Sequence, residues 1–141
     1  MFDEFISYLN ENEILVDVKN VDDILYKEID KYTKYVEKSL TENFKNKVLT
    51  EDENIYLDRT IKSYVNEHNF KIKDVELELN ACICNDEYES TNYCYYDVYI
   101  YAFGYCFDVA RFCIYVNYYD DSDNDFKVEN FRVELLYKDE E

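Results

Sequence analysis

Residues 93–119 read YCYYDVYIYAFGYCFDVARFCIYVNYY, and they carry the strongest structural signal in the chain. This stretch holds more than half of the protein's 17 tyrosines and its only glycine, Gly104. Aromatic and β-branched residues in this density are typical of paired strands. Because glycine alone adopts positive φ freely, Gly104 predicts a tight turn or a bulge between a strand over 93–103 and another over 105–119.

Two more segments have strand patterns on either side of this stretch. Over Val75–Ile83, apolar and polar residues alternate, which predicts a strand with one dry and one wet face. Residues 126–137 predict a last strand. Its phase switches after Val128, so we expect a bulge near Glu129–Asn130.

Alternation also assigns the side chains of the two central strands to two faces. One face is predicted to hold Cys94, Tyr96, Val98, Ile100, Ala102, Cys106, Ala110, Phe112, Ile114 and Val116. The other face is predicted to hold Tyr93, Tyr95, Asp97, Tyr99, Tyr101, Tyr105, Phe107, Val109, Arg111, Cys113 and Tyr115. Both faces are apolar or aromatic, so the pattern leaves open whether the second one meets helices, a partner or water.

The first half of the chain has helical periodicity instead. Apolar residues spaced three and four apart indicate three helices, over residues 2–10, 21–44 and 51–69. Asn20 is predicted to be the N-cap of the second helix, and Thr50 with Glu53 predicts a capping box for the third. Residues 11–20 fit either a short strand or an extended connector.

These elements together predict an α+β fold. We expect N-terminal helices packed on a C-terminal four-stranded antiparallel meander sheet. A length of 141 residues fits a single domain over 1–141, with a helical part of about 1–70 and a sheet part of about 71–137.

The charge balance narrows the choice of partners. The chain has 15 basic and 33 acidic residues, a formal net charge of −18. Such a field repels nucleic acid and anionic lipid, and it attracts basic proteins. The N-terminus lacks the basic and apolar regions of a signal peptide, and no long uncharged apolar stretch predicts a membrane span. We therefore expect a cytoplasmic protein, in a host cell's cytoplasm if it is phage-encoded, with its five cysteines reduced.

Catalytic and metal-binding motifs have little support. His68 is the only histidine, and near the predicted C-terminus of a helix we expect it to be structural. Cys82 and Cys84 lack the second pair that a structural zinc site requires. Residues 121–125 begin like a calcium-binding loop, but Phe126 occupies the position of its glycine. We expect no enzyme, no cofactor and no metal site.

The tyrosines and acids of the second half suggest a binding surface. So many tyrosines exceed what a core of this size can hide, and tyrosine is common at interface hot spots. Aromatic platforms that bind nucleic acid lie in basic grooves, whereas this half is the more acidic one. Carboxylates and rings on a sheet instead imitate phosphates and bases and would fit a basic groove. The predicted partner-binding residues are Glu76, Glu78, Asp86, Glu87, Glu89, Asp97, Tyr99, Tyr101, Asp120, Asp121, Asp123 and Asp125.

In size, acidity and lack of catalytic apparatus, the chain resembles phage-encoded inhibitors of host defence, such as anti-CRISPR and anti-restriction proteins. The resemblance is one of class and is carried by the acids just named. It implies a DNA mimic that occupies the basic nucleic-acid site of a nuclease or CRISPR effector, without direct contact with nucleic acid or membrane. The alternative hypothesis is a protein–protein interaction or oligomerisation module, including a homodimer, that uses a tyrosine-rich sheet face.

Overall fold

The computed structural model describes residues 2–84, 92–120 and 126–137, the side chain of residue 120 excepted. In chain order the elements are α1 (Asp3–Glu11), α2 (Val21–Phe44), β1 (Val48–Leu49), α3 (Glu51–Ile55), α4 (Leu57–Ile61), a short 3₁₀ helix (Lys62–Tyr64), β2 (His68–Ile72), β3 (Val75–Ile83), β4 (Tyr93–Ala102), β5 (Tyr105–Asp120) and β6 (Phe126–Tyr137).

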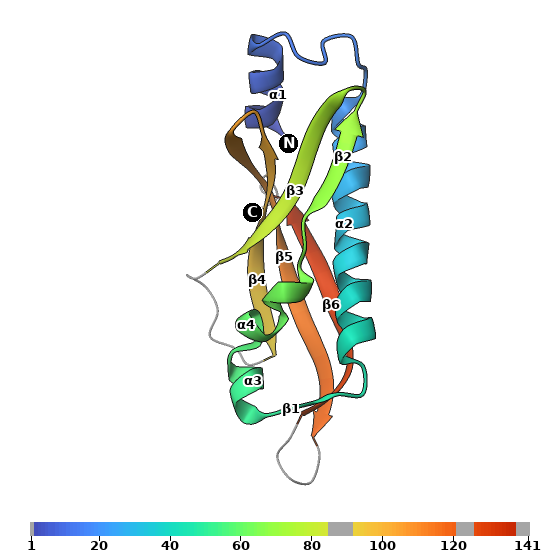
Figure 1. Cartoon of the computed structure of the whole chain (residues 1–141), viewed down its shortest axis with the longest axis vertical. Coiled ribbons are helices and arrows are strands. Elements are labelled where there is room, and N and C mark those ends of the chain that lie inside the picture. The colour runs from blue at the N-terminus through green and yellow to red at the C-terminus, as the bar shows by residue number, and fades with distance from the viewer. Residues whose placement is uncertain (1, 85–91, 121–125, 138–141) are drawn as a thin grey trace.

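The predicted α+β architecture is confirmed, but the sheet is larger than predicted. It is antiparallel and six-stranded, in the order β1-β6-β5-β4-β3-β2 (Figure 1). The prediction of four strands is wrong because β1 and β2 lie in the half that was expected to be helical. β1 pairs only two residues with β6, and β2 folds back on β3 through a two-residue turn. Strands of two and five residues are too short to produce a clear periodicity.

The third predicted helix is also interrupted. α3 ends at Ile55, and the non-helical backbone of Tyr56 changes the direction of the chain before α4 begins at Leu57. The change of direction buries Leu57 and Ile61 and leaves Ile55 and Tyr56 exposed. Both hydrogen bonds of the predicted capping box are present: the Glu53 amide donates to Thr50 Oγ1, and the Thr50 amide donates to Glu53 Oε1. Asn20 is the N-cap of α2 as predicted, but it has a left-handed backbone and its side chain makes no capping hydrogen bond.

One long helix supplies most of the helical side of the core. A stripe of α2 side chains is completely buried against one face of the sheet: Leu25, Ile29, Tyr32, Val36 and Leu40. The Tyr32 ring meets Phe112 of β5 at 5.1 Å between centroids, and Phe44 meets Phe131 of β6 at 5.5 Å. We call this the covered face of the sheet. Figure 1 shows α2 running alongside β6, with α1 at the β4–β5 turn and β1 at the other end of the sheet.

Two β-bulges set which side chains reach the covered face. In β6 the pairing passes from Asn130 to Val128, so Glu129 is the extra residue, as predicted. In β5 a second bulge at Val109 was not predicted. It reverses the alternation before it, so Phe107 packs on Phe5 of α1 while Cys106 is exposed. Tyr105 is displaced in the same way, since it pairs with Ala102 and packs on Tyr8 of α1. The predicted faces of Tyr105, Cys106 and Phe107 were therefore wrong.

The edge of the sheet beside α2 is closed by side chains. The Val133 amide of β6 donates to Glu37 Oε2 at 2.8 Å, and the Phe131 amide donates to Thr41 Oγ1 at 3.4 Å. Exposed edge amides are a template for pairing with another strand, and these two contacts remove them from that role.

Glu37→Ala should destabilise the fold, because it leaves the Val133 amide without an acceptor. We expect a loss of about 1–2 kcal/mol in the free energy of unfolding measured with urea. Glu37→Gln keeps an acceptor oxygen at the same position and should lose clearly less. Equal losses for the two variants would show that the hydrogen bond is not what Glu37 contributes.

The β4–β5 turn consists of Phe103 and Gly104. Their φ angles are 56° and 80°, and positive φ at both central residues is the pattern of a type I′ hairpin turn. A Cβ on Gly104 would meet no atom within 4 Å, so a side chain there is opposed by backbone strain alone. The predicted turn at Gly104 is thus confirmed.

Gly104→Ala should lower the free energy of unfolding by about 1–2 kcal/mol, since alanine resists a left-handed backbone. Gly104→Asn should lose less, because asparagine tolerates that conformation. Urea denaturation of both variants tests this ranking. A larger loss for asparagine than for alanine would contradict the strain explanation.

Candidate interaction surface

The sheet face opposite α2 has a different character from the covered face. In β4, side chains alternate between buried residues on the covered face and half-buried or exposed residues on the opposite one. The latter are Tyr93, Tyr95, Asp97, Tyr99 and Tyr101. Across the register, β5 and β6 add Cys106, Asp108, Arg111, Cys113, Tyr115, Asn130, Arg132 and Glu134 to the same side. We call this side the open face. Tyr93, Tyr95, Tyr99 and Tyr101 therefore do not face α2.

Five side chains at the centre of the open face contact one another. The Tyr93 ring lies 5.6 Å from Tyr95 and 5.8 Å from Tyr115, between centroids. Arg132 lies over the Tyr115 ring at 4.3 Å, and Arg111 lies over the Tyr95 ring at 5.8 Å. We call this set the tyrosine–arginine cluster. Its members hold each other in place before any partner arrives, so little side-chain entropy remains to be lost on binding.

The two arginines of the cluster also have acidic partners. Arg111 Nε donates to Asp97 Oδ1 at 3.1 Å, and Arg132 donates to Glu134 Oε2 at 3.2 Å. A hydrogen bond to the Cys113 thiol, together with burial, raises the pKa of Tyr115 to about 12. At neutral pH this tyrosine therefore keeps its hydroxyl proton.

Charges on the open face are nearly balanced in the described strands. The carboxylates of β3 to β6 that alternate onto it are Glu76, Glu78, Asp97, Asp108 and Glu134. The cations of β2, β5 and β6 on the same side are Lys71, Arg111, Lys127 and Arg132. Most of the net charge of −18 is therefore carried by other parts of the chain.

The structure brings part of the predicted site together. Glu76, Glu78, Asp97, Tyr99 and Tyr101 all lie on the open face. The predicted residues Asp86, Glu87, Glu89, Asp121, Asp123 and Asp125 lie outside the described residues, and so does the side chain of Asp120. The prediction omitted the tyrosine–arginine cluster. Alternation had placed four of its members on one face, whereas Arg132 joins them only through the pairing of β6 with β5.

A groove opens where the two hairpins diverge. The pairing of β3 with β4 begins at Glu78 and Tyr101, so the β2–β3 hairpin extends past the end of β4. The gap has a volume of about 580 Å³. It is lined by Asn69, Phe70, Lys71, Glu76, Leu77, Glu78, Tyr101, Ala102 and Phe103. Three of the predicted partner-binding residues thus line one groove.

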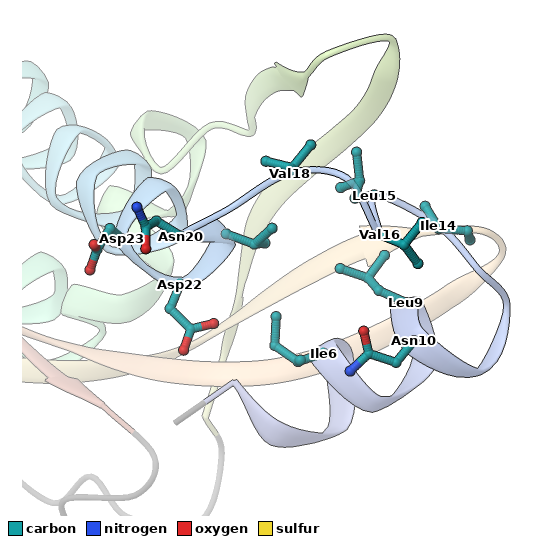
Figure 2. A pocket seen from close by; sticks show the side chains of 11 residues that line it. Ile6, Leu9, Asn10, Ile14, Leu15, Val16, Val18, Asn20, Asp22 and Asp23 are labelled. Carbon is teal, nitrogen blue, oxygen red and sulfur yellow. The ribbon is translucent and has the colours of Figure 1, made fainter.

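A second hollow lies between α1 and the start of α2 (Figure 2). Its walls are mostly aliphatic, from Ile6 and Leu9 of α1 to Val18 of the linker, and its volume is about 440 Å³. Asp22 and Asp23 border it, and both lie in the first turn of α2, where the helix dipole favours carboxylates. Stabilisation of α2 accounts for these two acids without a ligand.

His68 does not lie at a helix end, contrary to the prediction. It begins β2, and its Nε2 lies 2.8 Å from Glu28 Oε2 of α2. Its ring stacks on Tyr32 at 6.0 Å between centroids. Burial opposes ionisation of Glu28, but hydrogen bonds from His68 and Lys31 outweigh it and lower the pKa of this carboxyl. His68 therefore joins β2 to α2.

Glu28 should stabilise the fold at neutral pH and lose this effect in acid. Because its pKa is lowered on folding, its contribution is present above the unfolded value of about 4.5 and disappears as pH falls through the folded value. The stability difference between the natural protein and Glu28→Gln should therefore shrink between pH 5 and pH 3, as followed by urea unfolding. A difference that grows in this range would contradict the assignment.

Three further observations bear on function. All five cysteines are free thiols. Within residues 2–84, 92–120 and 126–137, no three histidine, cysteine or acidic side chains are grouped as a metal site would need. In the same part of the chain, no helix combines the length and apolarity needed to span a membrane.

Comparison with family models, with curated proteins and with solved structures found no match to this chain.

Proposed function

We propose that this chain is a non-catalytic binding protein whose open face docks onto a basic protein. The tyrosine–arginine cluster is the observation that supports this most directly. Tyrosine and arginine are the residue types that dominate interface hot spots, and here they are held together at the centre of a sheet face. The net charge of −18 adds long-range attraction for a basic partner and speeds encounter.

The partner class that fits best is an enzyme with a basic nucleic-acid-binding groove, such as a nuclease or CRISPR effector. In this proposal the chain is an inhibitor of the anti-defence type that occupies the groove. Because charges on the open face nearly balance, we assign close contact to the open face and long-range attraction to the rest of the surface. Rings and guanidinium groups make the close contact, while carboxylates elsewhere on the chain supply the steering field.

A second candidate is a homodimer that buries the open face. One observation favours it: the balanced charge of that face would limit repulsion between two copies that are otherwise strongly acidic. In this case the acidity of the rest of the surface would be incidental to binding.

Binding to purified nucleases and CRISPR effectors should separate the two candidates. We expect a basic partner whose affinity falls steeply between 50 and 300 mM salt. The double variant Tyr93→Ala and Tyr115→Ala should weaken binding by about 30-fold or more, as loss of hot-spot residues does. Tyr35→Ala is the matched control, because Tyr35 is an exposed tyrosine of α2 outside the open face.

Equal weakening by the control and by the double variant would contradict docking through the open face. Analytical ultracentrifugation addresses the homodimer. A dimer that persists at high salt and dissociates in Arg132→Glu would favour the second candidate over the first.

A further inference from the structure

The groove between the two hairpins combines aromatic rings with carboxylates. Tyr101 and Phe103 are 45% and 39% exposed, and Phe70 forms part of the opposite wall. Phe103 has a left-handed backbone, and its ring is stacked on Tyr8 of α1 at 5.3 Å between centroids. This wall of the groove is therefore fixed by α1. Exposed ring faces attract cations and also pack against the alkyl part of a long basic side chain.

One carboxylate that lines the groove, Glu78, has an acidic neighbour, Glu67, which lies outside the lining of the groove. Glu78 lies on the same side of the sheet as Glu67, which immediately precedes β2. Burial, a hydrogen bond to Glu67 and its charge together raise the pKa of Glu78. Two adjacent carboxyl groups repel each other when both are ionised, and a cation placed between them removes this repulsion.

The chain's own lysines and arginines do not neutralise Glu67 and Glu78. Lys71 forms its ion pair with Glu76 at 3.6 Å, and both side chains are more than half exposed, so that contact is weak. Among the described residues, no lysine, arginine or histidine forms an ion pair with Glu67 or Glu78. The groove thus presents carboxylate oxygens and rings to any cation that enters from outside.

We propose that this groove binds an arginine side chain of the partner protein. A planar guanidinium group stacks on aromatic rings and donates several hydrogen bonds to carboxylates at once, whereas a lysine ammonium does so less well. The groove lies beside the open face, because Glu78 and Tyr101 belong to both. The inference rests on the proposed function and assigns to the basic partner an arginine that enters this groove.

A short capped peptide with one arginine, acetyl-Gly-Arg-Gly-amide, tests the site on the full chain without a partner. In a titration followed by ¹H–¹⁵N NMR, we expect saturable shifts confined to amides of 69–71, 76–78 and 101–103. The matching citrulline peptide has the same shape without the charge and should not bind. The lysine peptide should bind more weakly. Shifts spread over the whole acidic surface, or equal binding of the citrulline peptide, would overturn the proposal.

Glu78→Gln should lower the affinity for the arginine peptide by about 10-fold, which is the loss expected for one charged hydrogen bond. Glu42→Gln is the matched control, because it removes one exposed carboxylate of α2 that lies outside both the groove and the open face. Tyr101→Ala is a second test that alters an exposed side chain, so the variant should stay folded. Unchanged binding in both Glu78→Gln and Tyr101→Ala would overturn the site.

Failure of this proposal and failure of the proposed function have different signatures. Specific peptide binding together with no docking to any basic enzyme would support arginine binding in the groove and refute the proposed function. Docking that Tyr93→Ala and Tyr115→Ala weaken, but Glu78→Gln does not, would support the open face and refute the groove.

Discussion

The structure depends on the packing of a single helix stripe across one face of the sheet. Each large apolar side chain that α2 buries there stabilises the fold by roughly 1.5–3 kcal/mol, and Leu25, Ile29 and Val36 are completely buried. The short helices α1 and α4 cover more of the same face. The Tyr96 hydroxyl of β4 donates to the backbone carbonyl of Asp58 in α4 at 2.6 Å and joins the two elements. Because the described helices lie on the covered face, the opposite face has to be compatible with water or with another protein.

Tyrosine meets that requirement in a way that aliphatic residues would not. Its ring gives rigidity and contact area, while its hydroxyl stays hydrated. On the open face these rings are combined with arginines that are each paired with a carboxylate, so the surface is ordered and locally almost neutral. A strongly acidic protein with a nearly neutral, aromatic sheet face can attract a basic partner from a distance and contact it through rings. The two properties lie on different parts of the molecule.

Local patterns predicted much of the fold. The strand over Val75–Ile83, the capping box at Thr50 and the bulge at Glu129 all appear within about ten residues of sequence, and all are present. The site was predicted in part: alternation alone put Tyr99 and Tyr101 on one face with Asp97. The Val109 bulge was missed because apolar residues occupy both phases of the strand around it, so no change of phase stands out, and only the pairing of β5 with β4 shows it.

Residue order and composition alone account for the class of the fold, the alternation of the strands and the large negative charge. Which face of the sheet is left open depends on where α2 packs, and that packing is a property of the folded chain. The same holds for Arg132 over Tyr115 and for Glu78 beside Glu67, because these contacts join different segments of the chain. In the tyrosine-rich stretch, alternate side chains of β4 pack into the core, and the side chains between them form the open face.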